Sequence, residues 1–196
     1  MKFVLASTNQ GKIKEMREIL KDTGARIVSR EELGIDIEVA ENGATFMENA
    51  LLKAEAIRKI SGLPAIADDS GLCVEALDGA PGIYSSTYGG ESLDDSARCA
   101  YLLKKLENVE HRSAKFVCTI VCSLPDGGVI TAQGECHGEI LKTPRGSGGF
   151  GYDPVFLVEG DGRSMAELSQ EEKNSLSHRG EALRKFAQLV KEGGIS

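Results

Sequence analysis

The sequence predicts an α/β protein built around a mixed β-sheet. In the N-terminal half, short apolar segments alternate with longer segments whose apolar residues recur every three or four positions. This alternation is typical of strand–helix units with parallel pairing. Further on, a Pro-Asp-Gly-Gly sequence separates two long β-like segments, which indicates an antiparallel hairpin. A sheet with both kinds of pairing accommodates both patterns.

The first elements alternate between strand and helix. Lys2–Ala6 is a short apolar segment that predicts a buried strand. Asn9–Asp22 follows as an amphipathic helix, which Gly24 ends. Arg26–Val28 predicts a second short strand.

The clearest helix begins at Thr45. Thr45 and Glu48 have the spacing of a capping box, an apolar stripe follows, and Gly62 ends the helix. Pro64–Ala67 predicts the next strand. The Asp-Ser-Gly that follows it is ordinary turn chemistry, so we expect this strand to end in a turn.

The rest of the chain predicts four further elements. Ser92–Leu106 has the pattern of a capped helix, and Ala114–Ile140 that of two β segments around the hairpin turn. Pro154–Val158 predicts another strand, and Ser177–Lys191 the final helix.

Composition excludes several classes of function. The chain has 196 residues, of which 41% are hydrophobic and 27% charged, as in ordinary globular domains. A net charge of −7 without a basic stripe argues against a nucleic-acid polymer as partner. No apolar run reaches the length of about eighteen residues that a membrane helix needs. The apolar run Phe3–Ala6 is too short for a signal peptide.

Cysteine and histidine usage indicates the compartment. The five cysteines are odd in number and form no C-x-x-C, which is typical of reduced thiols inside the cell. Three histidines are too few to favour a mixed zinc site. We therefore expect a cytoplasmic protein.

The segment ASTNQGKI, between the first strand and the first helix, is typical of an anion-binding loop. It nearly matches the P-loop pattern, but Ala6 replaces the first Gly and Ile13 the final Ser or Thr. A polar loop before a helix presents N–H groups to an anion, with Lys12 nearby. The alternative is structural: Thr8 or Asn9 caps the helix and Lys12 is solvated.

Glycines surround Phe150 and Tyr152 in the segment TPRGSGGFGYDPVF. Ordering such a loop costs conformational entropy. The loop precedes a strand, so it is neither a P-loop nor a dinucleotide fingerprint. Glycines let a ligand approach the backbone, and the aromatic ring between them can stack on a flat base. The alternative is a mobile hairpin loop.

Two cations stand where a helix start disfavours them. In EEKNSLSHRGEALRKF, Ser177 is the expected N-cap, which places His178 and Arg179 in the first turn. Positive charges there oppose the helix dipole, and a local rule broken in this way often marks a functional site. Lys173 adds a third donor in the loop predicted just upstream. The alternative is an exposed arginine with a small energetic penalty.

These stretches occur together and in order: STNQGK, ENGATFMENALLKA, ADDSGL followed by GAPGIYS, GSGGFGYDPVF and EEKNSLSHRG. In this combination the chain resembles the inosine triphosphate pyrophosphatase family over almost its whole length. The resemblance implies an elongated mixed sheet flanked by helices, with residues 1–196 forming one domain of two lobes and a central nucleotide cleft. It also implies a homodimer that uses Mg²⁺ to hydrolyse ITP, dITP and XTP to the nucleoside monophosphate and pyrophosphate.

The resemblance assigns roles residue by residue. Asp69 is similar to the family's metal ligand and general base, and Glu41 to its second acidic metal contact. Lys53 resembles a phosphate contact and Ser70 a nucleotide contact. The remaining positions form a triphosphate loop (Ser7, Thr8, Asn9, Gln10, Gly11 and Lys12) and a base pocket (Phe150, Gly151, Tyr152, Asp153, Lys173, His178 and Arg179). Asp68 receives no assigned role beyond a supporting charge.

The implied chemistry suits these residue types. Attack of water on phosphorus needs positioning and charge neutralisation more than a protein nucleophile, and Mg²⁺ needs only one or two carboxylates. For base choice, we expect Arg179 to donate to the 6-oxo group of the purine while Phe150 stacks on its ring. ATP leaves such a buried donor facing an amine, which penalises it. GTP shares the 6-oxo group, and this expectation does not explain its rejection.

Three alternatives stay open at this point. A Maf-type pyrophosphatase shares the metal chemistry but acts on pyrimidine nucleotides. A phosphatase of the haloacid dehalogenase type is suggested by the paired aspartates, although its D-x-D-x-T pattern is absent. A nucleotide-binding protein without turnover binds ITP and releases no pyrophosphate. A substrate panel with product analysis separates these alternatives.

Overall fold

Six strands form one sheet in the order β2-β1-β3-β4-β5-β6. The computed structural model describes residues 2–21 and 24–193. β1 pairs in parallel with β2 and β3, whereas β5 and β6 are antiparallel. The predicted mixed α/β sheet is therefore confirmed. The strands are β1 (Lys2–Leu5), β2 (Arg26–Ser29), β3 (Ala65–Val74), β4 (Ser113–Ser123), β5 (Val129–Ile140) and β6 (Phe156–Val158).

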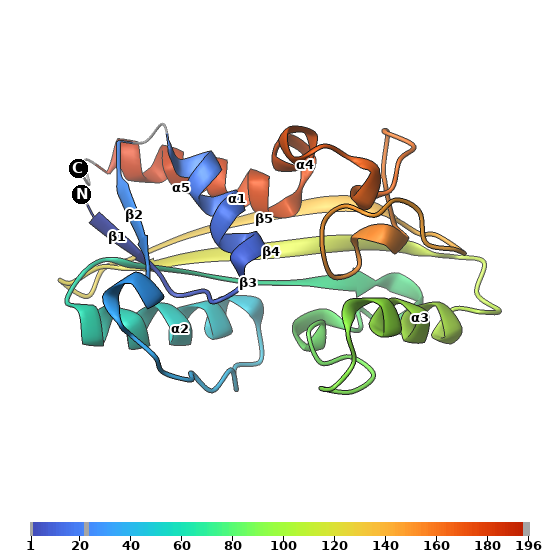
Figure 1. Ribbon diagram of the computed structural model, residues 1–196, viewed down its shortest axis with the longest axis horizontal. Coiled ribbons are helices and arrows are strands. Elements are labelled where there is room, and N and C mark those ends of the chain that lie inside the picture. The colour runs from blue at the N-terminus through green and yellow to red at the C-terminus, as the bar shows by residue number, and fades with distance from the viewer. Residues whose placement is uncertain (1, 22–23, 194–196) are drawn as a thin grey trace. The chain divides into compact units, whose positions relative to one another are not determined.

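In the part of the chain that the structure describes, five α-helices connect and cover the strands (Figure 1). They are α1 (Gln10–Leu20), α2 (Phe46–Ser61), α3 (Asp95–Lys105), α4 (Gln170–Leu176) and α5 (His178–Glu192). Short 3₁₀ turns are η2 (Glu31–Leu33), η3 (Glu75–Leu77), η4 (Gly82–Tyr84), η5 (Asp153–Val155) and η6 (Met165–Glu167). Within residues 2–21 and 24–193, no helix has the length and hydropathy needed to cross a bilayer.

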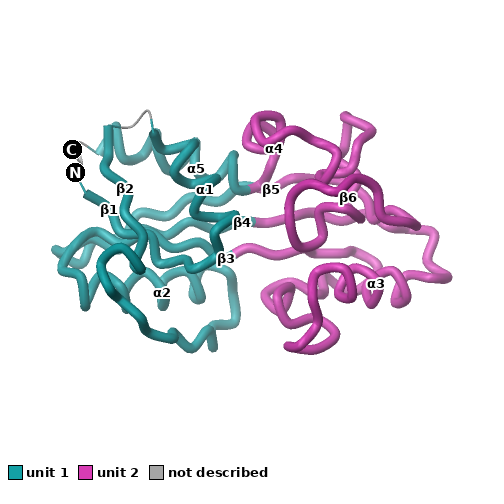
Figure 2. Tube along the Cα trace, viewed as in Figure 1, with its two compact units in different colours: residues 1–69, 118–134, 179–196 teal, residues 70–117, 135–178 magenta. Residues whose placement is uncertain are grey.

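The chain divides into two compact units (Figure 2). Unit 1 comprises the described residues of 1–69, 118–134 and 179–196, and unit 2 comprises residues 70–117 and 135–178. The borders fall within β3, β4 and β5, so each of these long strands contributes residues to both units. The border in β3 lies directly after Asp69.

The core of unit 1 follows the alternation of side chains along β1. Phe3 and Leu5 pack with Phe186 of α5 in one apolar cluster, and Val4 packs with Ile57 of α2 in another. α1 and α5 accordingly lie on one face of the sheet and α2 on the opposite face (Figure 1). In unit 2, Leu72 and Val74 of β3 belong to a third cluster that includes residues of α3, β4 and β6.

The predicted turn at Asp-Ser-Gly is wrong, because these residues lie inside β3. The strand continues from Ala65 through Gly71 to Val74. Leu72 and Val74 are fully buried in the core of unit 2. Burial of these apolar side chains outweighs the local preference of the preceding residues for a turn.

Other boundaries differ by a few residues. α3 begins at Asp95 rather than Ser92, with Asp94 as its N-cap. The strand predicted from Pro154 begins at Phe156, because Pro154 lies in η5. The hairpin is confirmed as β4 and β5, and α1 is confirmed up to Leu20. The predicted helix end at Asp22 lies outside the described residues.

The start of α2 has one of the two hydrogen bonds of a capping box. Thr45 Oγ1 accepts the Glu48 N–H at 3.1 Å, as predicted. The Glu48 side chain, however, accepts from the Ala44 N–H and not from Thr45, so the predicted reciprocal box is wrong. Gly62 ends the helix in the left-handed conformation, with φ +66°.

Removing this cap is expected to weaken the fold measurably. Thr45→Ala leaves the Glu48 N–H without its side-chain acceptor and lowers the free energy of unfolding by about 1 kcal/mol. Thr45→Ser keeps the hydroxyl and serves as the control. Urea denaturation followed by circular dichroism measures both variants; equal stability of Thr45→Ala and the wild type contradicts the assignment of Thr45 as the cap.

Candidate active site

Asp68 and Asp69 point in opposite directions from the middle of β3. Successive side chains on a strand alternate between faces. Asp68 is 2.9 Å from Lys12 Nζ and accepts from Arg179 Nε at 3.3 Å. Asp69 instead accepts from Lys53 Nζ at 3.2 Å and from the Asn49 amide at 3.4 Å. The two acids thus have separate partners, and that they have separate roles stays a prediction.

The Asp68 side forms a buried cluster of four charges, all within unit 1. Arg179, at the start of α5, donates to Glu15 of α1 at 2.5 Å as well as to Asp68. The side chains of Asp68, Arg179 and Glu15 are 1%, 2% and 3% exposed. Lys12 supplies the second cation. Two carboxylates thus face two cations, which offsets the large desolvation penalty of burying them.

The cluster keeps Asp68 ionised. Burial alone raises the pKa of Asp68, but the charges of Lys12, Arg179 and Lys53 together outweigh it and hold the pKa well below its ordinary value. Burial likewise lowers the pKa of Arg179, and the facing Asp68 and Glu15 carboxylates reverse that effect. Asp68 therefore stays ionised and paired with Lys12 and Arg179.

On the other face of β3, Lys53 bridges two carboxylates. Its Nζ lies 2.7 Å from Glu41 Oε2 and 3.2 Å from Asp69 Oδ1. Burial raises the pKa of Asp69 and Glu41 adds to that effect, although Lys53 and Lys12 oppose it. A carboxylate with a raised pKa accepts a proton more readily than an ordinary aspartate.

Asn49 connects the loop that carries Glu41 to Asp69, and the sequence did not predict this role. It lies in α2, is 3% exposed, and donates to Asp69 Oδ2. Its Oδ1 accepts the Gly43 N–H at 2.8 Å, so it connects the Glu41 loop to β3. A Cβ on Gly43 would lie 2.8 Å from that oxygen, so only glycine fits there. The one sequence signal for Asn49 was its place as a polar residue beside the apolar stripe of α2.

The carboxylates fit a magnesium ion by their chemistry. Oxygen atoms of Glu41 and Asp69 converge from separate elements on one cationic atom, Lys53 Nζ. Within the described residues, no three His, Cys, Asp or Glu side chains gather closely enough to hold a metal. Mg²⁺ typically takes one or two carboxylates and completes its shell with water and substrate phosphates. The pair therefore suits Mg²⁺ better than a metal that needs an all-protein site.

The predicted triphosphate loop lies between β1 and α1. Asn9 is the N-cap of α1, and its Oδ1 accepts the Lys12 N–H at 3.2 Å. Ser7 Oγ accepts the Asn9 N–H at 3.1 Å. Thr8, Asn9 and Gln10 are exposed, whereas Gly11 is half-buried. The capping alternative is thus correct for Asn9, but Lys12 is not simply solvated because it pairs with Asp68.

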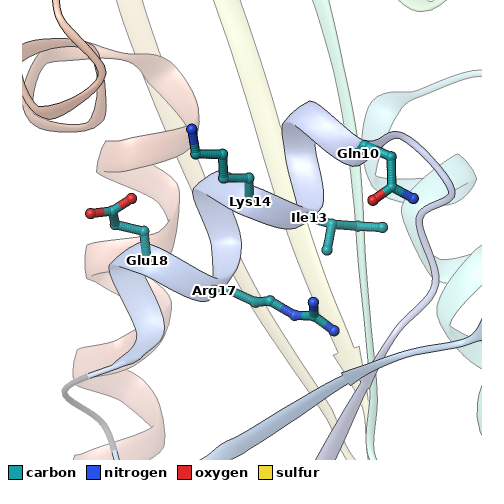
Figure 3. Close-up of a pocket in the computed structure, with 5 residues that line it drawn as sticks. All are labelled: Gln10, Ile13, Lys14, Arg17 and Glu18. Carbon is teal, nitrogen blue, oxygen red and sulfur yellow. The ribbon is translucent and has the colours of Figure 1, made fainter. Parts of the chain in front are cut away.

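A pocket of about 390 Å³ lies along α1 (Figure 3). It is lined by Gln10, Ile13, Lys14, Arg17 and Glu18. Gln10 donates to Glu31 and Arg17 to Glu32, so two of these side chains are engaged with η2. The lining includes neither Lys12 nor Asp68. This pocket is therefore separate from the charged residues on β3.

Unit 2 holds most of the predicted base pocket. Lys173 Nζ donates to Asp153 Oδ2 at 2.7 Å and lies 4.2 Å from the centre of the Phe150 ring. Asp153 Oδ2 also accepts the Phe150 N–H at 2.9 Å. The side chains of Lys173 and Asp153 are about 95% buried. Lys173 lies in α4, so the prediction of a loop there is wrong; Ser169 caps that helix.

The glycines around Phe150 permit a tightly folded loop. Gly149 has φ +72°, and a Cβ there would lie 2.0 Å from Asp153 Oδ2. A Cβ on Gly146 would lie 2.7 Å from the Ala166 backbone. The Gly148 N–H donates to the Ala166 carbonyl. Close backbone packing within unit 2 therefore requires several of these glycines.

The remaining predicted residues have partners of their own. His178 stacks on Phe116 with 4.8 Å between ring centres, and the Tyr152 hydroxyl donates to the Ser85 carbonyl. Ser70 is half-buried on β3. Arg179 belongs to unit 1, whereas the other predicted base-pocket residues belong to unit 2. These contacts explain the two cations at the start of α5, and the assignment of Arg179 to the 6-oxo group stays a prediction.

Comparison with known proteins identifies close relatives. Residues 3–189 match the Ham1 family. A dITP/XTP pyrophosphatase of Desulforamulus reducens is 50% identical over 192 residues, which cover 97% of this chain and 96% of the relative. A dITP/XTP pyrophosphatase of Geobacter sulfurreducens is 52% identical over 184 residues, which cover 93% and 92%.

Solved structures share the fold. A HAM1 protein from Coxiella burnetii has a TM-score of 0.91 and 41% identity, with 98% of this chain and 99% of that chain covered. The Ham1 protein of Staphylococcus aureus has a TM-score of 0.89 and 44% identity, with 98% and 100% covered.

Asp68 is expected to be a residue on which stability depends. Asp68→Asn removes one of the two carboxylates that balance Lys12 and Arg179 and lowers the free energy of unfolding at pH 7 by about 3–5 kcal/mol. Because the pKa of Asp68 is depressed in the folded state, its contribution is full above its ordinary pKa of 3.8 and is lost as the pH falls further. The difference between variant and wild type therefore shrinks below that pH.

The matched control is Asp69→Asn on the same strand. The pKa of Asp69 is raised because burial outweighs its attraction to Lys53 and Lys12, so neutralising it is expected to change stability little. Urea unfolding at several pH values measures both variants. A loss for Asp68→Asn no larger than for Asp69→Asn contradicts the distinction between the two aspartates.

Proposed function

The chain belongs to the Ham1 family, and from that premise we propose that it is a dITP/XTP pyrophosphatase. It hydrolyses deaminated purine nucleoside triphosphates to the monophosphate and pyrophosphate. Relatives described as dITP/XTP pyrophosphatases, 46–52% identical over 92–98% of this chain, support the activity and agree with what the sequence resemblance implied.

The observation that carries the proposal is the arrangement around Asp69. A buried acid with a raised pKa lies beside Lys53, Glu41 and Asn49, on the strand that also brings Asp68 to Lys12. Phosphoryl chemistry needs cations to neutralise charge and an acceptor to take a proton from water. Unit 1 supplies both kinds of group from neighbouring positions.

Asp69 is the proton acceptor in this proposal. A water oxygen forms a bond to the α-phosphorus, the bond from that phosphorus to the bridging oxygen breaks, and pyrophosphate leaves. The proton released by the water passes to an Asp69 carboxylate oxygen. Asn49 orients Asp69 by donating to Oδ2, while the Lys53 and Lys12 ammonium groups offset the negative charge of the phosphates.

Glu41 and Asp69 hold Mg²⁺ in this proposal. When bound, the ion neutralises phosphate charge and aligns the triphosphate. Asp69 would then be both a metal ligand and a neighbour of the reacting water, and the Lys53 ammonium would face the phosphates. The loop from Ser7 to Lys12 binds phosphate oxygens at the N-terminus of α1.

The base is bound by residues of unit 2. Phe150 offers a ring face for stacking, and Lys173 and Asp153 offer a donor and an acceptor beside it. Tyr152, Gly151 and His178 complete this set, with Ser70 as a nucleotide contact and Arg179 as the donor to the 6-oxo group. A site that pairs a buried donor with an oxygen discriminates against an amine at the same position.

We also propose that the protein is a cytoplasmic homodimer. The resemblance to the family supports the dimer. All five cysteines are free thiols, and burial raises the pKa of Cys118 and Cys122 to about 12. Buried, protonated thiols suit a reducing compartment. Sedimentation velocity of the purified protein tests the dimer.

Product analysis tests the activity directly. Incubation with dITP and Mg²⁺ is expected to release dIMP and pyrophosphate, with little orthophosphate, and XTP to behave alike. ATP and the pyrimidine triphosphates dTTP and UTP are poor substrates. Asp69→Asn is expected to abolish turnover at saturating Mg²⁺ while its unfolding curve stays near that of the wild type. Orthophosphate as first product, or full turnover by Asp69→Asn, contradicts the proposal.

Metal titration tests the role of Glu41. Glu41→Gln is expected to raise the Mg²⁺ concentration for half-maximal turnover by at least about tenfold, since even an outer partner of a metal ligand commonly contributes that much. Glu55→Gln, which changes an exposed glutamate paired with Lys59 on α2, is the control. An unchanged Mg²⁺ requirement in Glu41→Gln excludes that residue as a ligand.

A further inference from the structure

The peptide groups on both sides of Phe150 are each held by a carboxylate. The Phe150 N–H donates to Asp153 Oδ2 at 2.9 Å, and the Gly151 N–H donates to Asp95 Oδ2 at 2.7 Å. Asp153 belongs to the same loop, whereas Asp95 lies 56 positions away in the first turn of α3. Two fixed peptide planes determine the φ and ψ of the residue between them. They therefore set the direction in which the Phe150 ring leaves the backbone.

Cys99 holds the other polar group of Gly151. Its thiol donates to the Gly151 carbonyl at 3.4 Å, one helical turn beyond Asp95 and on the same side of α3. Cys99 is 4% exposed, and burial, followed by the charges of Asp95 and Asp153, raises its pKa to about 11. The thiol stays protonated near neutral pH and remains a donor. One helix thus binds both the N–H and the carbonyl of a single glycine.

Gly151 needs such external restraint. Its φ is +61°, and a Cβ built on it would meet nothing within 4 Å. Glycine has the widest conformational freedom of any residue, so bonds to the Gly151 backbone contribute directly to its order. The Tyr152 hydroxyl bond to Ser85 anchors the next residue, and the Asp153 N–H donates to the Phe150 carbonyl within the loop. Asp95 and Cys99 add restraints on Gly151 from outside the loop.

We propose that Asp95 and Cys99 are positioning residues for base recognition, which fix the Gly151 backbone so that Phe150 presents its ring to the purine. This inference rests on the proposed function, in which Phe150 stacks on the base. Neither residue touches substrate in this account. Their loss is expected to weaken nucleotide binding and leave the hydrolytic step at Asp69 in place.

Steady-state kinetics with dITP provides the first test. Asp95→Ala is expected to raise KM by about three- to tenfold with kcat within about twofold, the size of effect that the net contribution of a typical hydrogen bond supports. Asp95→Asn keeps an acceptor oxygen and restores KM toward the wild-type value. Cys99→Ala raises KM less, and Cys99→Ser, which retains a donor, restores it.

The matched control is Asp94→Ala. Asp94 is the N-cap of the same helix and accepts the Ala97 N–H, so this variant loses the same charge and weakens α3 without touching Gly151. Its Tm is expected to fall while KM stays at the wild-type value. An unchanged KM in Asp95→Ala overturns the proposal, and so does an equal rise in Asp94→Ala, because the effect then follows helix stability alone.

A fluorescence measurement tests positioning without any substrate. The chain contains no tryptophan, so Phe150→Trp introduces a single indole, which can be excited selectively over the four tyrosines. Adding Asp95→Ala to that variant is expected to increase acrylamide quenching of the indole, and adding Asp94→Ala to leave it unchanged. Increased quenching, together with failure of the wild-type protein to hydrolyse dITP, refutes the proposed function and supports the positioning role. Unchanged quenching refutes the positioning role whatever the substrate.

Discussion

The alternation of Asp68 and Asp69 along β3 is the constraint on which the rest of the site depends. Adjacent strand residues face opposite ways, so a single strand supplies one carboxylate to a buried ion cluster and another to a lysine and an amide on the opposite face. Asp68 meets Lys12 and Arg179, and Asp69 meets Lys53 and Asn49. Two neighbours that share the same backbone thereby have separate partners, and the proposed function assigns the chemistry to Asp69.

This division explains why opposite pKa shifts occur one residue apart. The charges of three cations lower the pKa of Asp68, and together they outweigh the effect of burial. Asp69 is influenced most by burial and is approached by the acidic Glu41, so its pKa rises. An acid that must stay charged to hold the fold and an acid that must exchange protons have different requirements, and the strand satisfies both. The cluster around Asp68 also ties α1 and α5 to β3 within unit 1 through Glu15 and Arg179.

Local patterns predicted much of this molecule. Amphipathic spacing located α1, α2, α3 and α5, and the Pro-Asp-Gly-Gly turn located the β4–β5 hairpin. Turn chemistry failed at Asp68–Gly71 because burial of Leu72 and Val74 decides the conformation there, and such burial depends on residues distant in the chain. α4 was missed for a related reason: it has only seven residues and no apolar period to reveal it.

In the candidate site too, contacts between residues far apart in the chain could not be predicted from local patterns. Motif order indicated Asp69, Glu41, Lys53 and Lys12, and the structure brings these charged residues to the two faces of one strand. Glu15, Asn49 and Asp95 act through contacts with residues 20 to 164 positions away, which no local pattern records. The two residues at the start of α5 have contacts that the sequence did not predict. Arg179 pairs with Glu15 and Asp68, and His178 stacks on Phe116.

The most direct test of this account is the titration of the two aspartates themselves. Carbon-detected NMR of the side-chain carboxyl groups, in metal-free protein, follows each residue separately, with Asp68→Asn and Asp69→Asn providing the assignments. The account predicts that Asp68 titrates well below its ordinary pKa of 3.8 and that Asp69 titrates above it. Equal pKa values for the two residues, or the reverse order, would contradict the division of roles along β3.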